Sequence, residues 1–327
     1  MASQDSQQRG IQGNHGGNLL SKKETRQQFA DTMFDVGQKD PNLVVLVGDI
    51  SHFMLQPFAM ACPGRYYNVG ICEPTIVSMA AGLAKMGFYP VVHTIAPFIV
   101  ERSFEQIKLD FCYQRLGGNL VTVGSAFDYS NLGCTHHCYG DFALSKTLPG
   151  AQITCPSSPV EFDTLFRQTY RNGSLTLFRI AGHQHGVDFG ADDIQLGRGI
   201  KVADGGNLTI VATGPQLGSA MSAREGLADM GWDAEILYIH TIRPLDTDLI
   251  RASVGKTRRV LVIEEHMRSG GLGDDVLRTV HDLCDIQFAS LSIPDAFVCD
   301  YGSYQEHCER LGLTPAGILR EVAERFE

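Results

Sequence analysis

An isolated glutamate, Glu73, lies where an apolar stretch gives way to a run of small residues. It closes the segment Tyr67–Glu73 and precedes Thr75–Ala84, which ends in Ala-Ala-Gly-Leu-Ala. This order predicts a position at the carboxyl-terminal edge of a parallel sheet, where α/β proteins bind ligands. A partly apolar interface favours the neutral carboxyl group, which could exchange a proton with a heterocycle nitrogen. The alternative is a first-turn acid that interacts favourably with the helix dipole.

Four further residues are candidates for ligand contacts. Phe98 follows a predicted strand and could stack on a planar ring, or could be an ordinary core residue. Arg102 and Arg179 lie near strand ends, where arginine can bind phosphate through two hydrogen bonds, although surface arginines are common. His136 lies in the loop Cys134–Cys138. We interpret it as a ligand contact, because zinc sites need more widely spaced ligand pairs.

The elements that must position these residues alternate between strand and helix. In the first half, apolar runs predict strands at 43–47, 65–69, 89–94, 119–124, 152–156 and 174–180, with helices at 24–38, 75–86, 98–113, 142–147 and 159–172. In the second half, strands are predicted at 208–214, 234–239, 259–264 and 286–292, with helices at 216–230, 246–254, 272–284 and 314–326. The pattern predicts an α/β protein with two doubly wound, mostly parallel sheet domains.

Composition along the chain sets the expected domain boundaries. Residues 1–21 are rich in Gln, Gly, Ser and Asn, which predicts a disordered N-terminal tail. We expect a first α/β domain at 22–185, a linker at 186–200 and a second α/β domain at 201–327. The turn Gly270–Gly273 lacks both the dinucleotide glycine spacing and a P-loop lysine, so a packing role is expected.

The overall composition excludes some function classes. The 327 residues are 43% hydrophobic and 20% charged, which suits ordinary domains with substantial cores. The net charge of −10 argues against a nucleic-acid partner. No apolar run is long enough to span a membrane, and no signal-peptide pattern opens the chain. The nine cysteines are scattered, as in a reduced cytoplasmic protein.

Taken in this order, the segments resemble the C-terminal half of transketolase. Three motifs surround the candidate residues: Gly70–Glu73 resembles Gly-Ile-x-Glu, His93–Phe98 resembles the segment that ends in a stacking phenylalanine, and Gly133–His136 resembles Gly-x-Thr-His. The similarity continues through Phe178-Arg179, Thr241–Asp246 and Glu264–Gly273. It covers residues 22–327 and is specific because the motifs occur in sequence. In one departure, Ile95 replaces the family's first aromatic residue.

The resemblance implies a pyrimidine-binding domain followed by a transketolase C-terminal domain, with thiamine diphosphate as the cofactor. It implies catalytic roles for Glu73 and His136. Cofactor contacts are implied for Glu73, Phe98, Ile71 and Arg102, and substrate contacts for Arg179, His136 and Asp49. The chain has no Gly-Asp-Gly motif, so no metal ligand is expected in it. Mg²⁺ and the diphosphate would be held by a larger partner subunit in an α2β2 assembly.

The implied activity is that of the smaller subunit of a split transketolase, moving a two-carbon ketol unit from a phosphorylated or sulfonated ketose to an aldose. Leu132 stands where the family has an Asp that binds a hydroxyl of the donor sugar. The family also has a His after the preceding strand, which is missing here; the nearest residue is Ala126. An altered donor sugar is therefore expected. The alternatives are a 2-oxoacid dehydrogenase E1 β subunit, a deoxyxylulose-phosphate synthase-like enzyme, or a non-catalytic regulatory homologue. The intact Glu73, Phe98, His136 and Arg179 argue against the last of these.

Overall fold

A computed structural model describes residues 23–326, so the tail expected at 1–21 lies outside the described residues. The strands are β1 Leu43–Val47, β2 Tyr66–Asn68, β3 Tyr89–Ile95, β4 Gly118–Val123, β5 Gln152–Thr154, β6 Leu175–Arg179, β7 Ile200–Ala203, β8 Leu208–Ala212, β9 Ala234–Tyr238, β10 Thr241–Arg243, β11 Arg259–Met267 and β12 Gln287–Ile293. The helices are α1 Thr25–Lys39, α2 His52–Ala61, α3 Glu73–Lys85, α4 Ala96–Val100, α5 Phe104–Gln106, α6 Asp141–Lys146, α7 Pro159–Thr169, α8 Gln216–Asp229, α9 Thr247–Thr257, α10 Leu272–Val280, α11 Tyr304–Leu311 and α12 Pro315–Phe326. A π-helix, η1, spans Ile107–Tyr113, and short 3-10 turns lie at Ser130–Leu132 (η2) and Ala191–Asp193 (η3).

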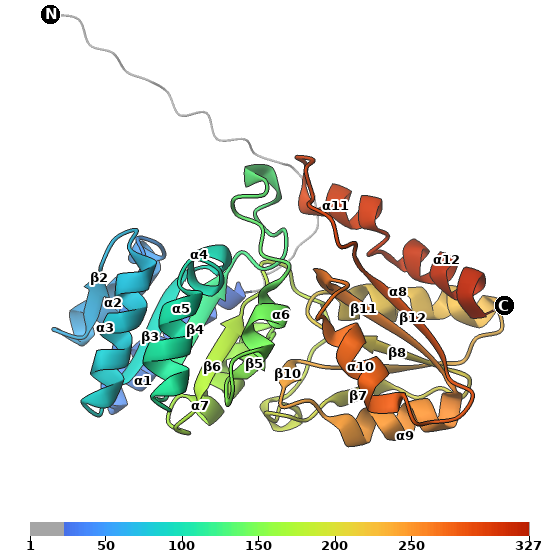
Figure 1. Cartoon of the computed structure of the whole chain (residues 1–327), viewed down its shortest axis with the longest axis horizontal. Coiled ribbons are helices and arrows are strands. Elements are labelled where there is room, and N and C mark those ends of the chain that lie inside the picture. Colours follow the sequence, from blue (N-terminus) through green and yellow to red (C-terminus); the bar gives the residue numbers. More distant parts are fainter. Residues whose placement is uncertain (1–22, 327) are drawn as a thin grey trace, which may run out of the picture.

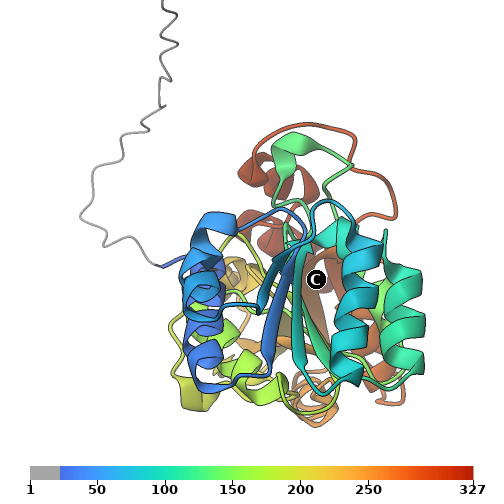
Figure 2. The same cartoon turned by 90° about the vertical axis from the view of Figure 1, so that its left-hand side faces the viewer.

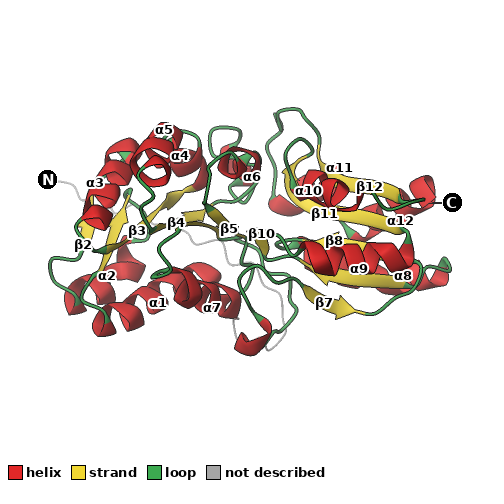
Figure 3. Ribbon diagram, turned by 60° about the horizontal axis from the view of Figure 1, so that its bottom comes forward, coloured by secondary structure: helices red, strands yellow, loops and turns green. Residues whose placement is uncertain are grey.

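The first sheet has seven strands in the order β10-β5-β6-β4-β3-β1-β2. Strands β1 to β6 are parallel, whereas β10 is antiparallel to β5. Helices α1, α2 and α7 cover one face, and α3, α4, α5 and η1 cover the other (Figure 3). Strand β10 comes from the second half of the chain, so both halves contribute to this sheet.

The second sheet has five strands in the order β12-β11-β8-β9-β7, and β7 is its antiparallel member. Helices α9 and α10 pack on one face, and α8 and α12 pack on the other (Figure 1). The predicted fold class is therefore confirmed: two mostly parallel, doubly wound sheets lie side by side. The antiparallel edge strands β7 and β10 were not predicted, because each is only a few residues long.

The cores follow from covering both faces of each sheet. All five residues of β1 are buried, as expected for a parallel strand with helices on both sides. One apolar cluster lies under α3 in the first sheet and continues to α9 and α10 of the second. The two sheets therefore pack as one body around a shared core. No described helix is long and apolar enough to cross a membrane.

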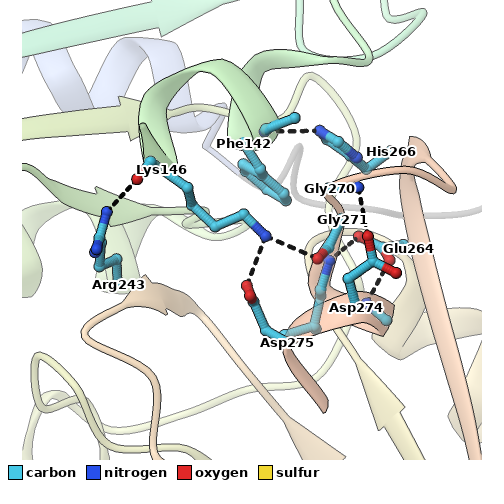
Figure 4. A network of polar contacts seen from close by, with 12 residues as sticks. Phe142, Lys146, Arg243, Glu264, His266, Gly270, Gly271, Asp274 and Asp275 are labelled. Atoms are coloured by element: carbon cyan, nitrogen blue, oxygen red, sulfur yellow. Dashed lines mark hydrogen bonds and ion pairs between the residues drawn. The ribbon is translucent and has the colours of Figure 1, made fainter. Parts of the chain in front are cut away.

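A polar network joins α6 of the first domain to β11 and α10 of the second (Figure 4). Lys146 Nζ lies 2.6 Å from Asp275 Oδ2 and donates to the Gly271 carbonyl at 2.9 Å. The rings of Phe142 and His266 stack with centroids 5.1 Å apart. These contacts fix α6, and with it the end of the loop that carries His136.

The turn Gly270–Gly273 before α10 binds a carboxylate of the same chain, in agreement with the packing role predicted for it. The backbone N–H groups of Leu272 and Gly273 donate to the Glu264 carboxylate at 2.6 and 2.7 Å. A Cβ at Gly271 would lie 2.5 Å from Glu264 Oε1, so a glycine is required there. Burial raises the pKa of Glu264 to about 7, and the two backbone hydrogen bonds oppose that shift. The helix N-terminus is thus already bound to a carboxylate.

The helix predicted at 98–113 is not continuous. It is divided into α4, α5 and η1, with an irregular segment at 101–103. There, the Arg102 N–H bonds to the Pro97 carbonyl at 3.1 Å instead of continuing a regular ladder. Helix α2 was also missed, because it contains Pro57 and exposes Phe53 and Met60, which hides any helical periodicity. Helix α11 was likewise not predicted.

Candidate active site

Glu73 is the first residue of α3, at the carboxyl-terminal edge of the first sheet. Its side chain is only 1% exposed. Oε2 accepts a hydrogen bond from Arg102 Nη1 at 2.8 Å, whereas the buried Oε1 has no partner among the described residues. An acid in the first turn of a helix also interacts favourably with the helix dipole. The dipole does not account for Oε1, because a buried oxygen without a partner is costly unless a ligand binds it.

Phe98 and His136 complete the site around Glu73. The Arg102 guanidinium carbon lies 4.2 Å from the centroid of the half-buried Phe98 ring. The His136 ring meets Phe98 edge-on, with centroids 5.4 Å apart. We call Glu73, Phe98, Arg102 and His136 the carboxylate–aromatic cluster. Its members come from three separate segments, and all four were predicted as site residues from the sequence.

The loop that carries His136 packs against the second domain. Thr135 Oγ1 lies 2.9 Å from His136 Nδ1, so Nε2 is the ring nitrogen left for a ligand. The loop projects above the first sheet beside the segment that precedes α11 (Figure 2). At that contact, the Tyr301 ring lies against Gly133, and the Val298 N–H donates to the Tyr139 hydroxyl at 3.3 Å. The second domain therefore helps to hold His136 over Phe98.

The remaining predicted contacts lie further out. Ile71 is 74% exposed in the turn between β2 and α3. Asp49 follows β1, where its Oδ1 accepts a hydrogen bond from Asn68 Nδ2 at 3.0 Å. Leu132 is 45% exposed at the end of η2. None of these side chains contacts the carboxylate–aromatic cluster in any described hydrogen bond or ring contact, so their roles stay predictions.

Arg179, which was predicted to contact the substrate, is buried between the two domains. It is 2% exposed, and its Nε lies 3.1 Å from Asp141 Oδ2, which is fully buried. Its Nη2 donates to the Glu265 carbonyl at 2.6 Å, and its guanidinium lies over the Phe142 ring. The Arg179 guanidinium thus has a carboxylate partner inside the protein, and its binding of a sugar phosphate stays a prediction. Its hydrogen bond to the Glu265 carbonyl joins the two domains.

Sequence reasoning missed Arg26, which begins a polar chain at the sheet edge. Arg26 Nε donates to Ser51 Oγ at 2.8 Å, and Ser51 Oγ lies 2.7 Å from His93 Nε2. His93 Nδ1 donates to the Val121 carbonyl at 2.8 Å, so Nε2 must accept from Ser51. Burial lowers the pKa of His93 to about 3, which keeps the ring neutral. The sequence held one indication of this contact. A positive charge in the first turn of a helix interacts unfavourably with the helix dipole, so an arginine at position 26 suggests another function.

Arg26 lines a pocket of about 270 Å³ that also contains Asp128, Tyr129 and His183. The Tyr129 ring lies 6.3 Å from the His136 ring, so the pocket adjoins the carboxylate–aromatic cluster. Burial lowers the pKa of His183, but the hydrogen bond to Asp128 and the negative charges of Asp128 and Glu265 together outweigh burial and raise the pKa. The pocket therefore places Arg26 and His183, together with the carboxylates of Glu24 and Asp128, next to His136. Across residues 23–326, no cluster of three His, Cys, Asp or Glu side chains could hold a metal ion.

The chain thus has two α/β domains, and the carboxylate–aromatic cluster lies at one edge of the first sheet. Residues 21–181 match the transketolase pyrimidine binding domain, and residues 197–318 match the transketolase C-terminal domain. The chain belongs to the transketolase family.

Two similar proteins are subunits of split transketolases. The chain is 29% identical over 305 residues to the 6-deoxy-6-sulfo-D-fructose transketolase subunit SqwH of Clostridium sp. (strain MSTE9), covering 92% of this chain and 94% of that protein. It is 30% identical over 302 residues to a subunit of the apulose-4-phosphate transketolase of Phocaeicola vulgatus, covering 91% and 96%. The identity over nearly the full length of both proteins shows that the chain is homologous to split transketolase subunits.

A solved structure described as a split gene transketolase, inactive beta4 tetramer, superposes with a TM-score of 0.83 at 26% identity. The match covers 93% of this chain and 98% of that one. The 1-deoxy-D-xylulose-5-phosphate synthase of Pelotomaculum thermopropionicum is 30% identical over 308 residues. This chain spans 47% of that synthase, about half its length.

Proposed function

We propose that the chain is the smaller subunit of a split, thiamine diphosphate-dependent transketolase, which transfers a two-carbon ketol unit from a phosphorylated or sulfonated ketose to an aldose. The observation that carries the proposal is that Glu73 and the half-buried ring of Phe98 lie around the same side chain, Arg102. One offers an unpartnered carboxylate oxygen, and the other offers an aromatic face. The names of the two split-transketolase relatives support the same reaction class.

The residues present fit an aminopyrimidine ring. Glu73 Oε1 is buried without a partner, and a ring nitrogen bearing a proton would satisfy it. When bound, thiamine diphosphate supplies the carbanion chemistry of ketol transfer. Glu73 would hold and move the proton at the pyrimidine N1′, while Phe98 stacks on the ring. His136 Nε2 would hydrogen-bond the donor oxygen on which negative charge develops.

We propose that the terminal anion of the donor sugar binds in the pocket beside His136, at Arg26, although Glu24 and Asp128 also line this pocket. Arg26 lines this pocket and is held in place through Ser51 and His93. A guanidinium fixed in this way is well suited to a phosphate or sulfonate. Binding at the far end of the sugar would orient the reacting carbonyl toward His136. Arg26 is therefore proposed as an anion contact, and Arg179 stays the contact predicted from the sequence.

A larger partner subunit would supply the Mg²⁺ and diphosphate half of the site. The chain exposes large apolar side chains at the β2 end of the first sheet, including Phe53 and Met60 of α2 and Ile71 beside Glu73. Exposed apolar side chains that gather on neighbouring elements mark protein interfaces. Because Ile71 is close in sequence to Glu73, the same interface would close the cofactor site. We propose an α2β2 assembly in the cytoplasm.

The test of this function is reconstitution. The isolated chain is expected to bind thiamine diphosphate weakly in calorimetry with Mg²⁺, because half of the site is missing. A mixture with a chain that carries Gly-Asp-Gly and a distal Asn is expected to bind the cofactor tightly and to transfer ketol units. Tight Mg²⁺-dependent binding by the isolated chain would contradict the split site. A mixture with pyruvate-dependent synthase activity and no ketol transfer would favour the deoxyxylulose-phosphate synthase alternative instead.

Donor choice should depend on Leu132, which cannot accept a hydrogen bond from a sugar hydroxyl. We expect the reconstituted enzyme to prefer a branched, modified or sulfonated ketose over xylulose 5-phosphate. Leu132→Asp should raise kcat/KM for xylulose 5-phosphate by about 5- to 150-fold, since one buried hydroxyl left unpaired costs about 1–3 kcal/mol. A ketose panel measures this preference.

The matched control for that substitution is Asn131→Asp, which adds the same charge one position away. It should leave the donor preference unchanged. If wild-type enzyme already handles xylulose 5-phosphate as well as its best alternative donor, Leu132 does not redirect the donor.

A further inference from the structure

Arg102 contacts both of the residues that are proposed to hold the aminopyrimidine ring. Its Nη1 donates to Glu73 Oε2 at 2.8 Å, and its guanidinium carbon lies 4.2 Å from the Phe98 centroid. A guanidinium is planar, donates N–H groups within its plane, and stacks on aromatic rings. A protonated aminopyrimidine has the same three properties. One side chain of this subunit thus contacts the two residues proposed to hold the cofactor ring, and leaves only Glu73 Oε1 without a partner.

We infer that Arg102 is a placeholder, which occupies the pyrimidine position between Glu73 and Phe98 in the cofactor-free chain and must be displaced when the cofactor binds. The inference rests on the proposed function, because it concerns the same site. It changes the role first expected for Arg102 from holding the cofactor to competing with it.

The surroundings of Arg102 allow it to leave while Glu73 stays in place. Arg102 lies in the irregular segment between α4 and α5, and its side chain is 45% exposed. Glu73 is anchored in the first turn of α3 and is almost completely buried. Turning the arginine into solvent requires only rotations of its own flexible side chain. The carboxylate cannot follow it without opening the helix.

The buried carboxylate explains why a placeholder is useful. A buried charge without a partner strongly destabilises a fold, so a cofactor-free Glu73 needs a compensating group. Arg102 provides this compensation until a ring with an N–H donor replaces it. Competition of this kind lowers the apparent affinity of the ligand. The apparent association constant is the intrinsic one multiplied by the fraction of chains in which the site is free.

The alternative is that Arg102 remains in place and holds the cofactor. The ring would then bind at Glu73 Oε1, which is unpartnered, while Arg102 keeps Oε2. The two arrangements predict opposite effects of removing the arginine. A placeholder lowers ligand affinity and its removal raises affinity, whereas a holding residue raises affinity and its removal lowers it.

The experiment is a titration of the full chain, without a partner, with 4-amino-5-hydroxymethyl-2-methylpyrimidine, followed by ligand-observed NMR. Arg102→Gln is expected to bind this pyrimidine about 5- to 30-fold more tightly than wild type, because a half-exposed ion pair and a cation–π contact no longer compete. Arg102→Lys keeps the charge and loses the plane, so it should lie between the two and should also preserve folding if the glutamine variant is unstable. Equal or weaker binding by both variants overturns the placeholder.

The matched control is Arg167→Gln, which removes an arginine of similar exposure whose partners, Asp35 and Asp163, lie outside the site. It should leave pyrimidine affinity unchanged. A second arm measures thiamine diphosphate binding by the reconstituted wild-type complex. Absence of that binding means that the proposed function fails. Normal binding there, with no gain in the Arg102 variants, means that only the placeholder fails.

Discussion

Replacing Glu73 by glutamine is expected to slow hydrogen–deuterium exchange at the thiazolium C2 of bound thiamine diphosphate by about 10²–10⁴-fold, the usual loss when a positioned proton carrier is removed. The carboxamide keeps the size of the side chain and can still accept a hydrogen bond from Arg102. It cannot move a proton at the pyrimidine N1′. Assembly with the partner and cofactor binding should therefore persist while activation is lost.

The exchange rate is measured on the reconstituted complex by acid quench and NMR. Glu101→Gln is the matched control, since Glu101 is a carboxylate next to Arg102 that contacts Cys138 instead of the cluster. It should exchange at the wild-type rate. A wild-type rate in Glu73→Gln would leave Glu73 with a structural role, as a first-turn acid of α3.

The sequence predicted those parts of the site that depend on short segments. Glu73 and Phe98 each follow a strand of a parallel sheet, so the alternation of strands and helices was enough to bring them to one edge. The interaction of Arg102 with both could not be predicted, because it depends on the break between α4 and α5. Nothing in the apolar pattern of residues 98–113 indicates that break.

Contacts between segments that are distant in the chain also could not be predicted from the sequence. Arg26 reaches the sheet edge only through Ser51 and His93, which lie far from it in the chain. Strand β10 joins the first sheet although it follows β9 of the second. A three-residue strand carries no periodicity of its own, so its pairing with β5 is set by packing between the domains.

Arg179 can serve either as an anion contact or as one half of a buried ion pair. Its position at the end of β6 fits an anion contact, but Asp141 and the Glu265 carbonyl enclose it in the structure. Burial raises the pKa of Asp141, and the neighbouring Arg179 charge opposes that shift. The pair is thus a buried ion pair in which each charge depends on the other.

Replacing Arg179 by methionine should therefore lower the free energy of unfolding by about 3–5 kcal/mol, because it leaves Asp141 buried without its partner. Urea titration measures the change. Arg167→Met is the control, since Arg167 forms half-exposed ion pairs that are worth about 0.2–1 kcal/mol each. The double variant Arg179→Met/Asp141→Leu should recover much of the loss, because no unpaired charge remains. If instead Arg179→Met is as stable as wild type and only its KM for phosphorylated sugars rises, the arginine binds substrate and must leave Asp141 to do so.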